Sequence, residues 1–205
     1  MINCSTDVQF LKLNYGKVTK KDRCDTNKHG SVLIWITGLP ASGKSTIAHE
    51  LEHRLFLKKI RAYVLDGDKI RDGLNKNLGF SAADRKENLR RAGEVAKLFV
   101  DAGIVTIAAF ASPYTFDRSM VRKLFDEGEF IEVYLKCDIK VCESRDPKGL
   151  YKKARLGEIQ NLTGVSDPYE APSNPEIILE TGKLSINESV NIIMKYLKEK
   201  ILMSS

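Results

Sequence analysis

The sequence predicts an α/β fold with three layers, in which helices cover both faces of a mainly parallel, five-stranded sheet. From Ser31 onward, short β-branched runs alternate with longer amphipathic segments, which is typical of parallel α/β architecture. The strand-like runs are short and apolar, as expected for strands that are buried on both faces. At 205 residues, the chain is long enough for one such domain and a short appendage.

Each element is predicted from its local pattern. Strands are expected where short apolar runs occur, at residues 32–37, 62–66, 104–110, 130–136 and 176–180. Helices are expected at the amphipathic segments, residues 44–58, 83–102, 115–126, 138–145 and 186–199. Because every predicted strand is followed by a helix, right-handed βαβ crossovers should connect the strands.

Two segments fall outside this alternation. Residues 1–30 are polar and basic without a lasting period, so we expect an N-terminal arm that is at most partly ordered, ahead of a domain at 31–205. Residues 146–175 contain several Lys and Pro residues and little apolar periodicity. Because so long an irregular insertion in a compact domain is usually functional, this segment predicts a lid.

Composition limits the classes of function. The net charge of +6 favours an anionic partner, yet no RNA-binding signature, zinc-finger spacing or long basic block indicates nucleic acid. The four cysteines form no CxxC pair, and His49 and His53 lack the Glu of a zinc-binding H-E-x-x-H motif. No apolar run reaches the roughly 18 residues of a membrane span, and residues 1–10 lack a signal-peptide core. We therefore expect a cytoplasmic protein without a membrane partner.

The most informative motif is GLPASGKS at residues 38–45, between the first predicted strand and the first predicted helix. Its glycines let the backbone wrap around phosphates, which the loop N–H groups and the helix dipole would bind. Lys44 can reach the β- and γ-phosphates, and the Ser45 hydroxyl can ligate Mg²⁺. The motif predicts a site for a nucleoside triphosphate. The alternative, a glycine-rich turn that binds nothing, is disfavoured by the strand and helix around it.

A second group of polar residues follows the second predicted strand, as Asp66-Gly67-Asp68. Ligands of open α/β sheets bind beyond the carboxyl ends of the strands, so these carboxylates should face the phosphate-binding loop. They could hold a hydrated Mg²⁺ or accept a proton from a substrate hydroxyl. The alternative is a turn with an Asp that caps the next helix.

A third group combines an aromatic ring with basic and polar side chains. Phe80 is followed by Arg85, Asn88, Arg90 and Arg91. An exposed Phe beside arginines suits an adenine ring that carries phosphate or sulfate. It is equally consistent with the sequence that Phe80 belongs to the core and that the arginines cover a helix surface.

Four segments together resemble the adenylylsulfate kinase family: GLPASGKST, LDGDKIRDGLNKNLGFSAADRKENLRR, SPY and DPKGLYKKARLGEIQNLTG. The resemblance runs from about Lys12 to Leu197, and residues 16–23 look like the segment before the core in bacterial members. Many families share the first motif, whereas the DGD and KGLYKKAR runs are much more specific. The resemblance implies the P-loop NTPase fold, with ATP and Mg²⁺ as cofactors.

The activity that the resemblance implies is transfer of the γ-phosphate of MgATP to the 3′-hydroxyl of adenosine 5′-phosphosulfate (APS), in sulfate assimilation. The products would be ADP and 3′-phosphoadenosine 5′-phosphosulfate. The residues implied to hold ATP are Gly38, Leu39, Pro40, Ala41, Ser42, Gly43, Lys44, Ser45, Thr46 and Arg145. Those implied to hold APS are Asp66, Asp68, Arg71, Phe80, Arg85, Asn88, Ser112, Lys148 and Leu162. The implied catalytic residues are Asp68 as the base, Lys44 and Ser112, and Ser45 is the implied metal ligand.

Ser112 matches a serine that the family carries as a phosphorylated intermediate. Because in-line transfer between two bound substrates needs only positioning and charge stabilisation, Ser112 could instead hydrogen-bond the substrate, or simply begin the next helix. The chain departs from the family pattern at Ala111, usually a bulkier aliphatic residue, and at Leu162, usually aromatic. Both changes should thin the apolar wall of the substrate pocket.

The resemblance also implies a homodimer and a separate ATP sulfurylase as functional partners. The rival activities are those of other P-loop kinases that act on a nucleoside monophosphate, gluconate or shikimate. A GTP-dependent switch is disfavoured because residues 75–78 (NKNL) lack the Asp of N-K-x-D.

Overall fold

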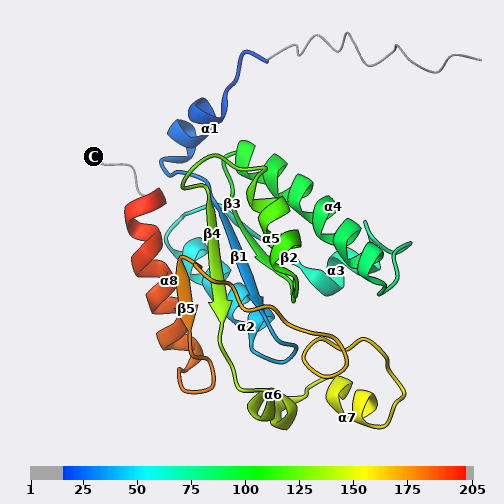
Figure 1. Cartoon of the computed structure of the whole chain (residues 1–205). Coiled ribbons are helices and arrows are strands. Elements are labelled where there is room, and N and C mark those ends of the chain that lie inside the picture. The colour runs from blue at the N-terminus through cyan, green and yellow to red at the C-terminus, as the bar shows by residue number, and fades with distance from the viewer. Residues whose placement is uncertain (1–15, 202–205) are drawn as a thin grey trace, which may run out of the picture.

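A parallel five-stranded sheet forms the centre of the protein, whose computed structural model describes residues 16–201 (Figure 1). The strands are β1 (Leu33–Gly38), β2 (Ala62–Asp66), β3 (Val105–Ala109), β4 (Phe130–Leu135) and β5 (Ile177–Leu179). Their order across the sheet is β2-β3-β1-β4-β5, and every neighbouring pair is parallel. All five predicted strands are confirmed, and so is the predicted fold class.

Helices cover both faces of the sheet, as Figure 1 shows. Ile34 and Ile36 of β1 pack in one core with α2 (Lys44–Leu57) and α8 (Ile186–Ile201). Leu33 and Trp35 point to the opposite face because side chains alternate along a strand. They pack in a second core with α4 (Ala82–Asp101) and α5 (Thr115–Arg122). The four consecutive apolar residues at the start of β1, positions 33–36, therefore contribute to both cores.

The remaining helices are α1 (Lys20–Asn27), α3 (Gly67–Asp72), α6 (Ile139–Arg145) and α7 (Leu150–Arg155). Of these, only α6 was expected from the sequence. The expected N-terminal arm at residues 1–30 contains helix α1, which the sequence pattern did not predict, and residues 1–15 lie outside the described part of the chain.

The physical reason for α1 is local capping together with docking onto the domain. Thr19 and Asp22 form a capping box at its first turn. Its Cys24 is buried, and the Asn27 side chain donates to the Gly103 carbonyl at 2.9 Å. A short polar helix of this kind has no strong apolar period, so periodicity alone misses it.

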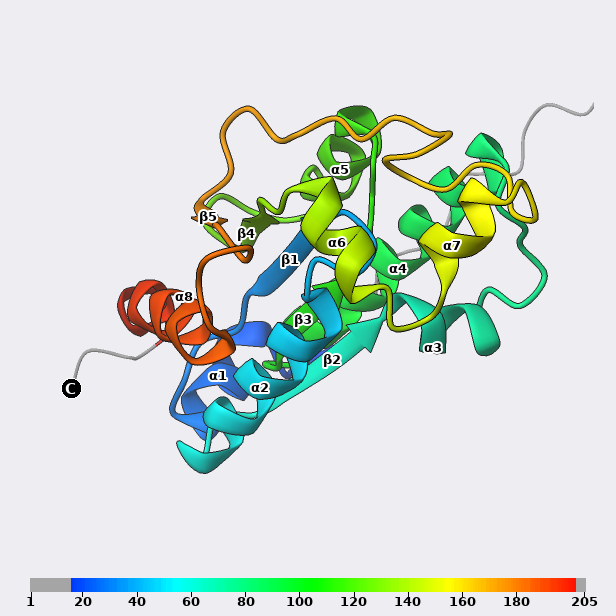
Figure 2. The same ribbon diagram turned by 90° about the horizontal axis from the view of Figure 1, so that it is seen from below.

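The lid segment at residues 146–175 lies across the carboxyl ends of the strands, together with α6 (Figure 2). It is less irregular than expected, because it contains α7. Beyond α7, the backbone N–H groups of Val165, Ser166 and Asp167 all donate to the Leu162 carbonyl, at 3.0–3.1 Å. This turn brings the second half of the lid back toward the sheet.

Within residues 16–201, no helix is long and apolar enough to cross a bilayer.

Candidate active site

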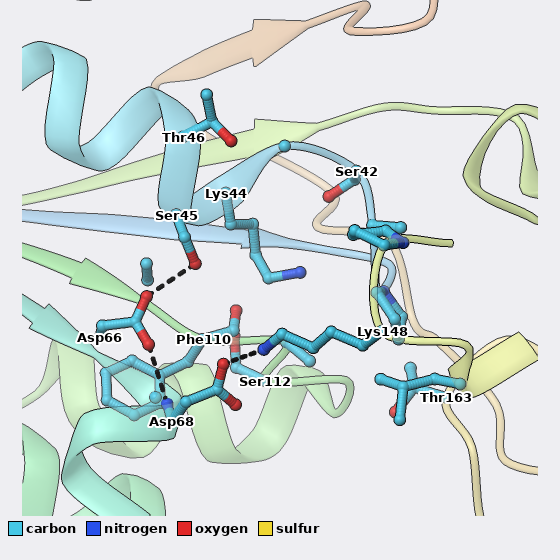
Figure 3. Close-up of a pocket in the computed structure, with 18 of the residues that line it drawn as sticks. Ser42, Lys44, Ser45, Thr46, Asp66, Asp68, Phe110, Ser112, Lys148 and Thr163 are labelled. Carbon is cyan, nitrogen blue, oxygen red and sulfur yellow. Dashed lines mark hydrogen bonds and ion pairs between the residues drawn. The ribbon is translucent and has the colours of Figure 1, made fainter. Parts of the chain in front are cut away.

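A cavity of about 970 Å³ opens where the carboxyl ends of the strands meet the lid (Figure 3). It collects residues that lie far apart in the sequence, from Pro40 to Ser189, because strands β1, β2 and β3 end at the same edge of the sheet. Gly38 and Leu39 do not line it. The other residues that the sequence analysis placed in the site do line it: Pro40, Ala41, Ser42, Gly43, Lys44, Ser45, Thr46, Asp66, Asp68, Arg71, Phe80, Arg85, Asn88, Ser112, Arg145, Lys148 and Leu162.

The P-loop backbone takes a shape that requires small residues. A Cβ on Gly38 would lie 2.9 Å from the Leu135 carbonyl oxygen of the neighbouring strand. Gly43 has a left-handed φ of +101°, which glycine adopts without strain. Ala41 has a φ of +58°, a conformation that costs a non-glycine residue about 1–3 kcal/mol. The packing around the loop must compensate for this strain at Ala41, which lies where the loop wraps around the cavity.

Lys44 reaches back over the loop that carries it. Its ammonium group donates to the carbonyl oxygens of Gly38 at 3.0 Å and Leu39 at 2.7 Å. These two residues therefore stay outside the cavity but hold its cation in place. Burial lowers the pKa of Lys44 to about 8. Phosphate oxygens would favour the charged ammonium, so their binding should raise this pKa again.

Ser45 and Asp66 meet at the floor of the cavity (Figure 3). The Ser45 hydroxyl donates to the Asp66 carboxylate at 2.6 Å, and the Asp68 backbone N–H donates to the same carboxylate at 2.9 Å. Burial acts to raise the pKa of Asp66, but these two hydrogen bonds outweigh it and lower the pKa below its usual value. Asp66 is thus both the cap of α3, which was the alternative reading, and an ionised group in the cavity.

A hydroxyl beside an ionised carboxylate fits Mg²⁺, which prefers oxygen ligands and keeps several waters. In the described part of the chain, no cluster of three or more His, Cys, Asp or Glu residues could hold a metal ion alone. Ser45 and Asp66 could therefore hold Mg²⁺ only together with water and nucleotide oxygens, as this ion usually requires.

Asp68 and Lys148 form an ion pair between α3 and the lid (Figure 3). Both side chains are more than half exposed, at 66% for Asp68 and 57% for Lys148. They remain accessible to a ligand in the cavity. The pair places a carboxylate and an ammonium group opposite the P-loop.

Phe80 lines the cavity with 63% of its surface exposed, so it does not belong to the core. The Arg71 guanidinium lies 4.5 Å from the centre of its ring and also donates to the Gly79 carbonyl at 2.9 Å. By contrast, Arg90 and Arg91 both pair with Glu87 on α4, at 2.7 and 2.8 Å. For these two arginines, the helix-surface reading is correct.

Arg85 connects α4 to the lid. Its guanidinium donates to the Phe80 carbonyl and to the Thr163 hydroxyl, each at 3.0 Å, and also to the Asn161 carbonyl. It lies 3.5 Å from the Asp167 carboxylate as well. Such a side chain fixes the lid loop against the helix.

Asn88 supplies a buried polar wall. It is 4% exposed, and its amide oxygen accepts a hydrogen bond from the fully buried Asn75 at 2.9 Å.

Ser112 lies in the wall of the cavity, but its hydroxyl is engaged with the sheet. The residue is 3% exposed. Its oxygen accepts from the Trp35 indole at 3.1 Å and donates to the Thr37 hydroxyl at 2.9 Å. Its φ of +38° is unusual for a serine, and its carbonyl accepts from Arg118 at 2.7 Å. Through these contacts, Ser112 links the segment after β3 to strand β1 by hydrogen bonds.

Arg145 borders the P-loop side of the cavity, where it donates to the Thr181 carbonyl at 2.7 Å. The Thr181 hydroxyl in turn donates to the Ser42 carbonyl at 2.9 Å. The sequence analysis missed Thr181 and also missed Tyr151, whose hydroxyl donates to the Pro40 carbonyl at 3.0 Å. Tyr151 lies inside the KGLYKKAR run, whose aromatic residue between basic ones is a signal that could have found it.

Comparison with known proteins agrees with this geometry. The family model for adenylylsulphate kinase matches residues 30–180. The adenylyl-sulfate kinase of Staphylococcus haemolyticus is 59% identical over 90% of this chain and 92% of its own. That of Oceanobacillus iheyensis is 55% identical over 97% and 98%.

Among solved structures, the APS kinase of Mycobacterium tuberculosis in complex with AMPPNP and APS superposes with a TM-score of 0.80. It is 46% identical and covers 82% of this chain and 98% of its own. A sugar kinase from Janibacter, at 18% identity and a TM-score of 0.59, shares the fold alone. The extent and identity of these matches show that the chain belongs to the adenylylsulphate kinase family.

Proposed function

We propose that the protein transfers the γ-phosphate of ATP to the 3′-hydroxyl of APS. The observation that carries this proposal is a single cavity with two halves, a P-loop on one side and Asp68, Lys148 and Phe80 on the other. A cavity of about 970 Å³ lies at the upper end of the range for small-molecule sites, as two nucleotides side by side require.

The donor half would hold the ATP phosphates. Backbone N–H groups at the start of α2 and the helix dipole favour an anion there, and Lys44 adds a positive charge. Ser45 and Asp66 would hold Mg²⁺, which when bound neutralises charge on the phosphates. Thr46 and Arg145 line the same cavity, and Arg145 would face the nucleotide base.

The acceptor half would hold APS. The exposed ring of Phe80 would stack on the adenine ring. The guanidinium of Arg71, which lies against the Phe80 ring, would bind the negatively charged phosphosulfate group. Asn88 supplies a hydrogen-bonding wall. Leu162 and Ala111 complete the apolar side, where smaller residues than the family usually carries leave more room.

The chemical step would rest on Asp68 and Lys148. The Asp68 carboxylate would accept the proton of the 3′-hydroxyl, which orients the oxygen for in-line attack. Lys148, now paired with Asp68, would turn to the phosphoryl or sulfate oxygens when both substrates are present. The lid would exclude water, which otherwise competes as acceptor. Ser112 would support this arrangement without receiving the phosphoryl group, because its hydroxyl is already paired with β1.

An ADP-release assay with a panel of acceptors tests this function. APS, AMP, gluconate and a reaction without acceptor should be compared at equal ATP and Mg²⁺ concentrations. We expect ADP release only with APS, together with formation of 3′-phosphoadenosine 5′-phosphosulfate. Faster release with AMP or gluconate would assign the cavity to a different small-molecule kinase.

Three expectations about the setting remain predictions: a cytoplasmic location, a homodimer, and supply of APS by a separate ATP sulfurylase. Cell fractionation, size-exclusion chromatography with light scattering, and a coupled assay with a sulfurylase would test them in turn.

A further inference from the structure

One buried side chain fastens the lid helix α7 to the P-loop. Tyr151 is 2% exposed, and its hydroxyl donates to the Pro40 carbonyl at 3.0 Å across 111 positions of sequence. The helix that carries Tyr151 begins two residues after Lys148, the residue that pairs with Asp68. A single hydrogen bond therefore links the donor loop to the segment that covers the acceptor.

The carbonyl that Tyr151 binds belongs to the Pro40–Ala41 peptide of the P-loop. It precedes Ala41, whose left-handed φ of +58° is rare for a residue other than glycine. In a trans peptide, the carbonyl and the following N–H point in opposite directions. The bond from Tyr151 thus turns the Ala41 N–H away from α7. Ala41 lines the cavity, and within residues 16–201 its N–H has no acceptor.

The lid touches the P-loop at a second point nearby. Gly164 has a φ of +89°, and a Cβ there would lie 2.6 Å from the Leu39 side chain. Arg85 holds the neighbouring Thr163 at 3.0 Å. The lid therefore rests on two consecutive P-loop residues, Leu39 and Pro40, and a shift of the P-loop must displace the lid.

We propose that Tyr151 is a positioning residue that couples ATP binding to lid placement. Its hydroxyl holds the Pro40–Ala41 peptide so that the Ala41 N–H faces the donor phosphates. A nucleotide in the loop stabilises the same arrangement, and so holds α7 and Lys148 over the acceptor. The coupling is reciprocal, because each ligand must change the affinity of the other by the same factor. The identity of the acceptor in this inference rests on the proposed function.

The test is a binding cycle with the Tyr151→Phe variant, which keeps the ring and removes the hydroxyl. Isothermal titration calorimetry would measure the Kd of APS with and without AMPPNP, and the Kd of AMPPNP alone. In the unmodified protein we expect AMPPNP to tighten APS binding about 5-fold or more. In the variant this ratio should fall toward one, and the AMPPNP Kd should rise about 2- to 10-fold.

Tyr134→Phe is the matched control, because the Tyr134 hydroxyl has no hydrogen-bond partner in the described part of the chain and the residue lies outside the cavity. Its coupling ratio should not change. A role of Tyr151 in stability alone predicts a lower unfolding midpoint with an unchanged ratio, and that result would overturn the proposal. If the unmodified protein fails to use APS, the proposed function is wrong. The AMPPNP titration still decides about Tyr151, since an unchanged Kd would exclude it from positioning the loop.

Discussion

The donor and acceptor halves of the cavity are built in different ways. The donor half comes mainly from one run, residues 40–46, whose backbone N–H groups β1 and α2 hold in place, and Asp66 and Arg145 complete it. The acceptor half draws side chains from α3, from the segment between α3 and α4, from α4 and from the lid. Its central residues Asp68, Phe80 and Lys148 are all more than half exposed.

This difference predicts which substitutions should affect ATP binding and which should affect APS binding or catalysis. A backbone cradle survives most side-chain changes, so ATP binding should be robust outside Lys44 and Ser45. An acceptor site made of exposed side chains has no such protection. Changes on the acceptor side should therefore alter catalysis or APS binding while ATP binding stays intact.

The largest expected effect is that of Asp68→Asn. Loss of the base should lower kcat about 10²- to 10⁴-fold, while the ATP affinity stays unchanged. Steady-state ADP release at saturating APS, together with calorimetry for ATP, would measure both. Asp72→Asn is the matched control, since Asp72 lies on the same helix but outside the cavity. Near-normal turnover of Asp68→Asn would show that Asp68 is not the base. It would also contradict the expectation that the acceptor half depends on its exposed side chains.

The next effect is that of Phe80→Ala. Loss of stacking should weaken APS binding about 5- to 150-fold, the equivalent of about 1–3 kcal/mol per base, and leave ATP binding unchanged. The control is Phe116→Ala, because Phe116 is 67% exposed and also contacts a cation, Lys86 at 5.1 Å, but lies outside the cavity. Equal weakening of both substrates would show that Phe80 supports the whole site.

The donor half should show its own signature in pH. Lys44 has a pKa of about 8 in the free protein, and bound phosphates should raise it. Full affinity is then present below pH 8 and is lost as the pH rises through that value, by about tenfold per unit. ATP titrations from pH 8 to 9.5, above the range in which phosphates titrate, would show this loss together with proton uptake. An ATP affinity that stays constant over that range would contradict the lowered pKa of Lys44.

The smallest effect on activity is expected for Ser112→Ala. Most turnover should remain, because the hydroxyl is paired with β1 and the residue would not receive the phosphoryl group. The free energy of unfolding should fall by about 1–3 kcal/mol, because the buried Trp35 N–H loses its acceptor. Chemical denaturation and ADP release would measure both. Loss of activity together with a phosphoserine found by mass spectrometry would reverse this assignment.

The sheet and the position of the P-loop were predicted well from the sequence, because each depends on contiguous residues. Five short apolar runs that alternate with amphipathic segments are typical of buried strands, and GLPASGKS contains the glycines that its loop shape needs. The helices that it missed, α1, α3 and α7, are short and polar and are held by caps and docking. Their stability comes from contacts with distant segments, and the hydrophobic periodicity of the local sequence does not reveal such contacts.

For the acceptor half, the sequence supplied the residues but not their partners. Phe80 could have been core or surface until the fold placed it in the cavity. Arg85 was expected to grip the substrate, yet in the structure its guanidinium already binds the lid through Thr163 and Asn161. Such pairings depend on where residues 156–175 fold back, which no local pattern specifies.

Helix α1 lies near the amino ends of the strands (Figure 1), whereas the cavity opens at their carboxyl ends. Its Arg23 bonds the Asp101 carboxylate at 2.9 Å, and its Lys20 pairs with Glu129, close to where β3 and β4 begin. The Lys21 side chain on this helix is 82% exposed. A biotin attached there would anchor the molecule to a sensor surface in one orientation, with the lid and the mouth of the cavity facing the flowing solution.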